Sequence, residues 1–144
     1  MTQDHQRDDV PADMARLKKR AEFVWVASGA KWGTKSALLQ ARAPKTDVGP
    51  IRIGFTATKR LGNAVIRNRA KRRLKAASDE LFPSLARPGM DYVLIARPGA
   101  LTQPYKLLLD DIKEALKRVH ARTDAGGRGG KPSTKNRRST KKTT

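Results

Sequence analysis

The stretch from Lys59 to Lys75 carries the side chains whose types and spacing could do chemistry. It contains eight bases and no acid, namely Lys59, Arg60, Arg67, Arg69, Lys71, Arg72, Arg73 and Lys75. Arginine forks bind phosphate oxygens in pairs, and the interleaved Asn68 can hydrogen-bond a sugar or a base edge. The chemistry that this composition favours is recognition of a phosphate backbone, not the making or breaking of bonds.

Helical periodicity sorts these side chains. Asn63 is a natural N-cap, and a helix is predicted from about Ala64 to about Ser78 or slightly beyond, on the apolar stripe of Ile66, Ala70, Leu74, Ala77 and Leu81. With Ala70 toward the core, Arg67 and Arg73 flank the stripe. The side chains expected to point outward are Asn68, Arg69, Lys71, Arg72 and Lys75.

Like charges at this helical spacing destabilise an isolated helix. A helix that carries them without a neutralising acid is therefore suited to lie against phosphates. The alternative is a merely solvated face, but such faces usually mix both signs of charge. The helical wheel does not distinguish DNA from RNA.

The composition of the whole chain points the same way. Its 144 residues include 32 Lys and Arg against 13 Asp and Glu, which gives a net charge of +19 and makes a nucleic acid the default partner. No apolar run is long enough for a spanning helix, the first residues are polar and acidic, and cysteine is absent. We expect a cytoplasmic protein with no membrane partner.

The charge is unevenly distributed along the chain, and this predicts three segments. Residues 1–15 hold four acids and one base and are predicted to be a flexible acidic head. Residues 123–144 hold seven bases and one acid with no apolar period, which is typical of a disordered basic tail. Residues 16–122 remain as the folded domain, which fits the size of a single modest core. Composition leaves open whether the tail binds phosphates or only solubilises the chain.

The remaining pattern predicts a small α+β domain with helices packed on a sheet. Strands are expected at 36–43, 51–58 and 92–97, with loops at 44–50 and at the chain breaks Pro83 and Pro88-Gly89. A last helix starts at Pro104, with Leu108, Ile112, Ala115, Leu116 and Val119 as its core stripe. The run Phe23 to Val26 suits a strand by propensity but also fits a short helix that ends at Gly29, and local patterns leave both open.

Little in the sequence could build a protein active site. His5 and His120 lie near opposite ends, and both are expected to be isolated surface histidines. The adjacent acids Asp79-Glu80 and Asp110-Asp111 are expected to be solvated, with the first pair closing the basic helix. Ser36 and Ser78 have no evident histidine partner. We therefore predict no catalytic residue and no metal site in the protein itself.

The basic stretch and the strand before it also resemble a known family. The segment from Arg52 to Leu74, with Arg67-Asn68-Arg69 at its centre, is similar in order and nearly without interruption to the signature of the bacterial ribonuclease P protein component. Weaker similarity covers Arg16 to Arg122, including the opening Arg16 to Phe23 and the late strand Asp91 to Arg97. Residues 1–15 and 123–144 lie outside it.

The resemblance implies a fold and a function that the composition does not show. The fold would be an αβββαβα sandwich of the ribosomal protein S5 domain 2-like kind, with an unusual left-handed βαβ crossover, and Phe23 would lie on a helix. The chain would be the protein subunit of an endoribonuclease, a hydrolase that removes the 5′ leader of precursor tRNA. Catalysis would belong to the RNA subunit, which would hold Mg²⁺, while the protein alone would bind no cofactor. We expect a monomer in the free state.

The resemblance also implies two binding sites. The basic helix and the loop before it would bind the catalytic RNA through Lys59, Arg60, Asn63, Arg67, Asn68, Arg69, Lys71, Arg72, Arg73 and Lys75. A cleft between the first helix and the sheet would bind the single-stranded leader of precursor tRNA through Phe23, Trp25, Lys31, Lys35, Gln40 and Arg52, with Trp32 nearby. Stacking on aromatic rings would hold unpaired bases without selecting their sequence.

Two positions depart from the family pattern. Many relatives carry a second aromatic one helical turn after the first and another in the cleft strand, where this chain has Ala27 and Gln40. This leaves Phe23 as the main stacking residue, unless its ring belongs to the core. Two other classes share the charge and size of this chain, a ribosomal RNA-binding protein and a DNA-binding protein that uses the basic helix. The match from Lys59 to Leu74 favours the ribonuclease P family over both.

Overall fold

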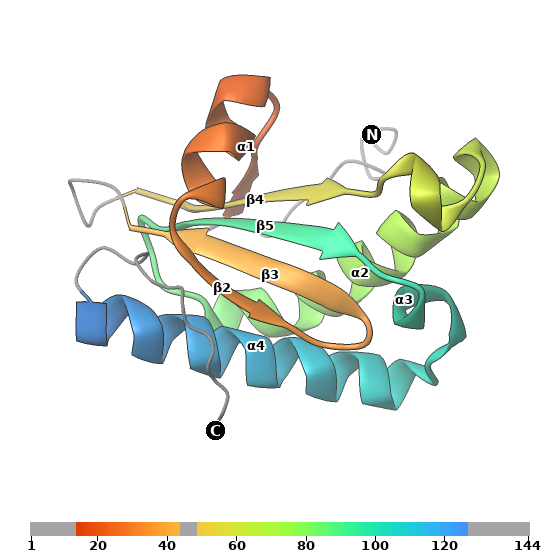
Figure 1. Cartoon of the computed structure of the whole chain (residues 1–144). Helices are drawn as coiled ribbons and strands as arrows, with labels where there is room; N and C mark the ends of the chain where they lie inside the picture. Colours follow the sequence, from red (N-terminus) through yellow and green to blue (C-terminus); the bar gives the residue numbers. More distant parts are fainter. Residues whose placement is uncertain (1–13, 44–48, 127–144) are drawn as a thin grey trace, which may run out of the picture.

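The computed structural model describes residues 14–43 and 49–126 and shows one mixed sheet covered by helices on both faces (Figure 1). The elements follow one another as β1 (Met14–Arg16), α1 (Arg20–Ala27), β2 (Ala30–Gly33), β3 (Ala37–Arg42), β4 (Ile51–Thr56), the 3-10 turn η2 (Lys59–Leu61), α2 (Ala64–Leu85), β5 (Asp91–Ala96), α3 (Gly99–Thr102) and α4 (Tyr105–Gly126).

The five strands lie in the order β1-β4-β5-β3-β2. The pairs β1 with β4 and β4 with β5 are parallel, whereas β3 runs antiparallel to both β5 and β2. Residues that pair side by side share a face of the sheet, so Lys31, Gln40, Val93 and Gly54 form one row across four strands.

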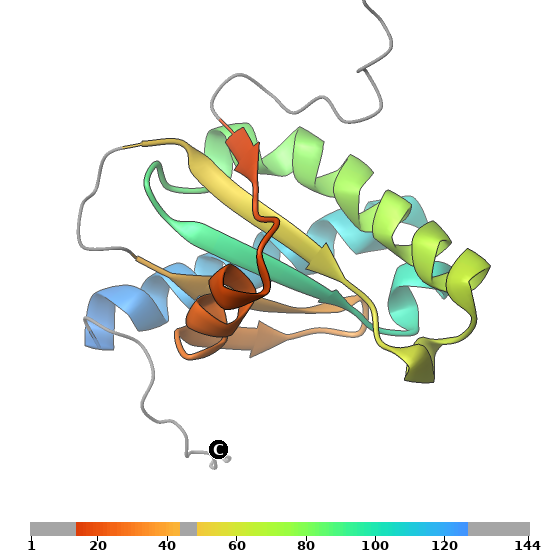
Figure 2. The same cartoon turned by 90° about the horizontal axis from the view of Figure 1, so that it is seen from above.

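The helices divide the sheet into two faces (Figures 1 and 2). On one face α1 packs over a small cluster of Leu17, Val26 and Val93. On the other face α2 and α4 cover the main core, to which β5 contributes Tyr92 and Leu94. The alternation of Tyr92, Val93 and Leu94 between the two faces explains why β5 is apolar along its whole length.

The connection from β4 through α2 to β5 has the left-handed sense that the family resemblance implies. Figure 2 is seen with α1 toward the viewer, and along the direction of the two parallel strands β5 lies to the right of β4 while α2 passes beneath the sheet. Viewed from the helix side, the chain therefore moves to the left, against the usual handedness of such units. This crossover brings the basic helix to the face opposite α1.

The helix stripes agree with prediction. In α2 the side chains of Ala70, Leu74 and Ala77 are fully buried, and all five expected core residues of α4 are buried as well. The local ambiguity at Phe23 is resolved as helix α1, whose first turn is stabilised because Glu22 Oε1 accepts hydrogen bonds from the backbone N–H groups of Lys18 and Lys19 at 3.0 Å.

The prediction that Pro83 breaks the chain is wrong, because α2 continues through it to Leu85. Pro83 removes only one hydrogen-bond donor and its ring is exposed, while Leu81 and Phe82 anchor the last turns in the core. The backbone N–H of Ala86 still bonds to Phe82 O at 2.9 Å. Three strands that the sequence placed lie within two residues of their expected ends, but β1 and α3 were not predicted.

The folded domain extends beyond the predicted limits at both ends. Strand β1 begins at Met14, inside the predicted acidic head, and α4 ends at Gly126, inside the predicted basic tail. The rest of the predicted head and tail, residues 1–13 and 127–144, lies outside the described residues, as does most of the predicted loop 44–50.

Candidate nucleic-acid interface

The start of α2 is fixed by the residues that precede it. Lys59 and Arg60 lie exposed in the turn η2, and Gly62 follows with a φ of 150°. A Cβ on Gly62 would come within 2.9 Å of the Ile66 side chain, so glycine is required there for steric as well as conformational reasons. Asn63 Oδ1 accepts a hydrogen bond from Ile66 N at 3.0 Å. Asn63, predicted to bind RNA, is thus already used as the helix cap.

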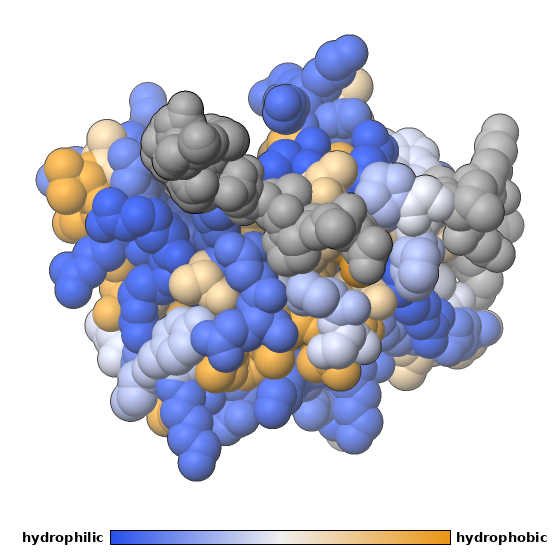
Figure 3. Space-filling view, turned by 180° about the vertical axis from the view of Figure 1, so that it is seen from behind, coloured by the Kyte–Doolittle hydropathy of each residue, from blue (hydrophilic) through white to orange (hydrophobic). Residues whose placement is uncertain are grey.

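The outward face of α2 is cationic, as the periodicity predicts. Asn68, Arg69 and Arg72 are exposed, Lys71 and Lys75 are half-buried, and no acid occurs between residues 64 and 78. The face of the molecule that carries α2 is largely hydrophilic (Figure 3). A helix surface of one charge sign, held rigidly by a buried stripe, can lie along a phosphate backbone without rearranging.

Arg67 and Arg73 differ from the exposed Arg69 and Arg72 because they make hydrogen bonds within the fold. Arg67 Nε donates to Gly62 O at 3.2 Å, which ties the helix to the turn before it. The two terminal nitrogens of Arg73 donate to Ala100 O and Gln103 O, both at 2.8 Å, and so hold α3 against α2. The bases predicted to bind RNA therefore include two that already stabilise the protein.

The acids of α2 do not close the helix as predicted, although Glu80 is exposed and Asp79 is half-buried. Asp79 and Glu80 lie within α2, five residues or more before its end at Leu85. Tyr105 donates to Glu80 Oε2 at 2.6 Å, and burial together with this bond raises the pKa of Tyr105 to about 12. Burial raises the pKa of Asp79.

Phe23, predicted to bind the leader, lies on α1 and faces the sheet. Its ring lies against Gly54, where an added Cβ would be 2.5 Å from the ring. The ring is half-buried and packs against the cluster of Leu17, Val26 and Val93. Phe23 therefore combines a packed edge with an accessible surface, which a stacking residue requires.

Arg52 also lies on this face, but it is engaged in ion pairs. Its guanidinium binds Asp91 through two hydrogen bonds of 2.8 and 2.6 Å and binds Glu22 Oε2 at 3.0 Å. Asp91 is only 2% exposed, and this buried partner, followed by Glu22, raises the pKa of Arg52. Because Glu22 belongs to α1 and Asp91 to β5, Arg52 fastens the helix to the sheet.

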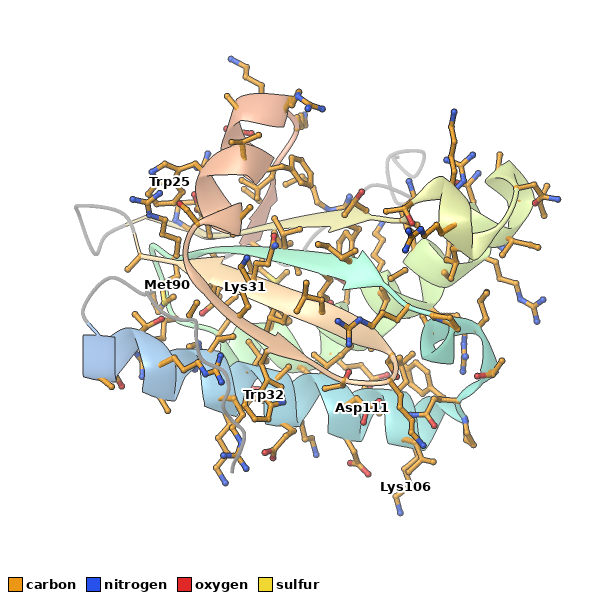
Figure 4. The ribbon with its side chains drawn as sticks, viewed as in Figure 1. Trp25, Lys31, Trp32, Met90, Lys106 and Asp111 are labelled. Carbon is orange, nitrogen blue, oxygen red and sulfur yellow. The ribbon has the colours of Figure 1, made fainter. Side chains whose placement is uncertain are left out.

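The other predicted leader-binding residues differ in exposure, and Trp32, which was expected nearby, lies on the opposite face of the sheet. Figure 4 shows Lys31 on the α1 side, and Lys31 and Lys35 are both exposed. Trp25 is half-buried beneath the guanidinium of Arg42, whose carbon lies 4.3 Å from the ring centroid. Trp32 points to the opposite face, toward α4, so it does not belong to the cleft.

Trp32 forms a different contact that the sequence did not indicate. Arg118 and Arg122, one turn apart on α4, place their guanidinium carbons 4.9 and 5.0 Å from its ring centroid. Arg122 also donates to Lys31 O at 2.8 Å. These contacts fix the end of α4 to the edge strand β2.

His120 is not the isolated surface residue that the sequence predicts. Its Nε2 lies 2.7 Å from the hydroxyl of Tyr92, which also accepts from Arg87 N at 2.9 Å. Burial lowers the pKa of His120 to about 4, so the ring is neutral near pH 7. Its Nε2 can then accept a hydrogen bond from the Tyr92 hydroxyl. The signal was present in the sequence, since His120 follows the buried Leu116 by one helical turn. His5 lies outside the described residues.

Asp111 and Ser36 help to hold α4 against the sheet, whereas Asp110 is exposed as predicted. Asp111, predicted to be solvated, accepts hydrogen bonds from Ser36 Oγ at 2.7 Å and Gln103 Nε2 at 2.8 Å. Ser78 Oγ donates to Leu74 O within α2. Within residues 14–43 and 49–126, no group of three or more His, Cys, Asp or Glu side chains is arranged to hold a metal ion.

These features define a class, that of small basic α+β proteins with a cationic helix on one face of the sheet and a short helix packed on the other. Comparison with known proteins identifies the family within this class. A family model described as Ribonuclease P matches residues 12–120. The chain belongs to the ribonuclease P protein family.

Named relatives and solved structures agree. The ribonuclease P protein component of Ruegeria pomeroyi is 48% identical over 109 residues, which cover 73% of this chain and 86% of the relative. That of Paramagnetospirillum magneticum is 49% identical over 114 residues, which cover 76% and 86%. The structure of the Staphylococcus aureus RNase P protein matches with a TM-score of 0.59 at 27% identity and covers 72% of this chain and 93% of that one. The fold also matches the Thermotoga maritima protein, at 21% identity and a TM-score of 0.61, over 73% of this chain and 97% of that one.

None of the helices in the described part of the chain is long and apolar enough to cross a membrane.

Proposed function

We propose that the chain promotes the endonucleolytic removal of the 5′ leader from precursor tRNA, as the protein subunit of ribonuclease P, by binding the catalytic RNA and the leader on opposite faces of its sheet. Membership of the family supports the role in tRNA 5′ processing. The observation that carries the division of labour is the separation of the two surfaces by the sheet, with α2 on one face and α1 on the other.

The catalytic RNA binds to the cationic face of α2. Arg69 and Arg72 are exposed, and Lys59 and Arg60 extend the same charge beyond the helix start. Phosphate contacts of this kind fix orientation without reading sequence. Arg67 and Arg73 contribute mainly by holding the turn and α3 in place, although their charge adds to the field of the face.

The leader of the precursor binds in the cleft beside α1. Phe23 offers a ring held in place by Gly54, and the exposed Lys31 and Lys35 supply charge for leader phosphates. Arg52 is occupied by Asp91 and Glu22, so its role is to hold α1 at the correct distance from the sheet. Trp25, covered by Arg42, is a lesser stacking surface than Phe23.

The chemistry of hydrolysis resides in the RNA subunit, which supplies Mg²⁺. The protein contributes no general acid or base in this proposal, in which the half-buried His120 is held by Tyr92, and Glu80 and Asp111 by hydrogen bonds within the fold. In the free state the chain is a monomer in the cytoplasm.

Reconstitution tests the function directly. The full chain is mixed with bacterial ribonuclease P RNA and precursor tRNA at low Mg²⁺, and leader removal is compared with that of the RNA alone. We expect strong stimulation by the protein, weakened by added salt. Absence of stimulation, with binding to ribosomal RNA instead, would support a ribosomal role, and tighter binding to duplex DNA than to structured RNA would support a DNA-binding role.

Phe23→Ala tests the leader site separately. It should weaken the discrimination between precursor and mature tRNA and leave affinity for mature tRNA nearly unchanged. Leu107→Ala is a suitable control because Leu107 is an apolar residue that lies 45% exposed on α4. An equal loss of affinity for both substrates would show that Phe23 acts through packing.

A further inference from the structure

A second cationic surface lies at the outer edge of the sheet, where α4 packs against β2. It consists of Trp32, which is half-buried on β2, and of Arg118 and Arg122, whose guanidinium groups lie over its ring. We call these three residues the Trp32 edge. An open hollow beside the ring is lined by Lys31, Trp32, Gly33 and Arg122. An anion can therefore approach the ring and its arginines from solvent.

The two arginines keep hydrogen-bond donors that the fold does not use. Arg118 uses only its Nε, which donates to Glu114, and Arg122 uses only one terminal nitrogen, which donates to Lys31 O. The other guanidinium nitrogens of both residues have no hydrogen-bond partner among the residues that the structure describes. A guanidinium that lies on an aromatic ring keeps its in-plane N–H groups available, and these groups can bind oxyanions in pairs.

The charge around the Trp32 edge is positive. Residues 115–123 of α4 contain three exposed bases and no acid. Glu114, one turn earlier, pairs with Arg118, and both carboxylate oxygens of Asp124 are bound by an arginine that follows α2. Residues 127–144, which follow α4 in the chain, add seven bases and no acid. A polyanion is therefore the ligand that this surface favours.

The position of the Trp32 edge favours the catalytic RNA over the leader as that polyanion. On one face of the sheet α2 packs against β4 and β5, and α4 packs beside it against β3 and β2. Helices that pack side by side have axes about 8–10 Å apart. An RNA that lies on α2 therefore reaches the Trp32 edge by extending across one neighbouring helix. In the proposed function the leader binds on the opposite face.

We propose that Arg118 and Arg122, held on Trp32, bind the phosphate backbone of the catalytic RNA at a second point, separate from its contact with α2. Two separate contacts on one rigid domain fix the orientation of the protein on the RNA better than one helix does. Phosphate contacts do not read bases, so the Trp32 edge adds affinity and orientation without sequence selectivity. The inference rests on the proposed function.

The test measures equilibrium binding of the full chain to bacterial ribonuclease P RNA at several salt concentrations. In one variant Arg118→Gln and Arg122→Gln remove both charges, and in another Arg118→Lys and Arg122→Lys retain the charges without the guanidinium forks. The control combines Lys18→Gln with Arg20→Gln, which removes two exposed charges at the start of α1, on the other face of the sheet. Thermal unfolding of each variant and the Kd of precursor tRNA for each assembled complex are measured alongside.

In the glutamine variant, the slope of log K against log salt should become shallower by about 1.4–1.8, the contribution of two phosphate contacts. When salt is raised fourfold, its loss of affinity should therefore be about tenfold smaller than that of the unaltered chain. The lysine variant should keep the original slope, because each ammonium still neutralises one phosphate. The control should change the slope by less than about 0.5, and the Kd of precursor tRNA should change by less than about twofold in every variant without a change at α1.

Four results would overturn the inference. An unchanged slope in the glutamine variant would show that these arginines contact no phosphate of the catalytic RNA. An equal change in the control would show that only the net charge of the chain matters. A lysine variant that binds as weakly as the glutamine variant, with the same fall in melting temperature, would assign both arginines to packing.

The fourth is a loss of precursor affinity with unchanged binding to the catalytic RNA, which would assign the Trp32 edge to the tRNA. Each of these results leaves the proposed function intact. That function fails only if the unaltered chain does not stimulate leader removal by the catalytic RNA.

Discussion

Arg69 and Arg73 stand one turn apart on α2, and their substitution by alanine should have opposite consequences. Arg73 donates two hydrogen bonds of 2.8 Å to the backbone of Ala100 and Gln103, whereas Arg69 is exposed and directed away from the core. Hydrogen bonds from a charged donor contribute about 1.5–3 kcal/mol each when buried. Because Arg73 is only half-buried, we assign about 2 kcal/mol to the pair of bonds.

For a domain of this size, about 2 kcal/mol corresponds to a fall in Tm of roughly 8 °C, which is the expected result for Arg73→Ala. For Arg69→Ala we expect a change of no more than about 2 °C, because removing it also relieves repulsion with Arg73. Thermal unfolding followed by circular dichroism measures both values.

For RNA binding we expect the opposite order, with the larger effect in Arg69→Ala and the smaller effect in Arg73→Ala. Each cation that neutralises one phosphate makes the slope of log K against log salt steeper by about 0.9. Arg69→Ala removes one such cation, so its binding should depend less on salt. When salt is raised fourfold, the loss of affinity should be about threefold smaller for the variant than for the unaltered chain. The assay is equilibrium binding to bacterial ribonuclease P RNA at several salt concentrations. If Arg69→Ala destabilises the fold as much as Arg73→Ala, or leaves the slope unchanged, the assignment of outward and anchoring cations on α2 is wrong.

Three further predictions concern the cleft and the end of α4. Gly54→Ala should displace the Phe23 ring, since the new Cβ would lie 2.5 Å from it, and leader discrimination measured with precursor and mature tRNA should fall at least as far as in Phe23→Ala. Asp91→Asn should free Arg52 from its strongest partner, lower Tm by several degrees, and make α1 more sensitive to proteolysis, while affinity for the catalytic RNA stays within about twofold. For His120 the folded pKa lies below the ordinary value, so its contribution to stability is complete above about pH 6.5 and is lost as pH falls toward 4. Discounted for the partial exposure of His120, that loss of stability is about 1–2 kcal/mol. A His120→Gln variant should therefore show a flatter dependence of unfolding free energy on pH. An unchanged pH profile in the variant would exclude His120 as the source of the pH dependence.

The sequence was sufficient to predict the helices and strands that bury a regular row of apolar side chains. The stripes of α2 and α4 were predicted correctly because five apolar side chains at helical spacing leave one orientation against a sheet. The alternation from Ile51 to Phe55 placed β4 in the same way. Only the resemblance resolved α1, whose apolar residues fit strand and helix equally well.

Local sequence patterns could not predict the features that depend on residues far apart in the chain. Strand β1 is three residues long and exists because β4 offers it an edge, with Met14 beside Ile51. The pairing of Arg52 with Asp91 joins residues 39 positions apart, so nothing near Arg52 showed that its charge is occupied. The contacts of Arg73 with α3 and of Trp32 with α4 were not foreseen for the same reason, because charge and aromatic character in a sequence do not show which contacts the fold has already satisfied.

The contacts of Arg118 and Arg122 with β2 protect one edge strand of the sheet from pairing with another molecule. An outermost strand offers backbone groups to which another chain can add, and this is a common route to aggregation. Here Arg122 occupies the carbonyl of Lys31, and the Trp32 ring is covered by guanidinium groups of the last helix. Any incoming strand would have to displace these cations and approach a surface of like charge. The same arginines that secure the last helix thereby discourage self-association during the interval between synthesis and assembly with RNA.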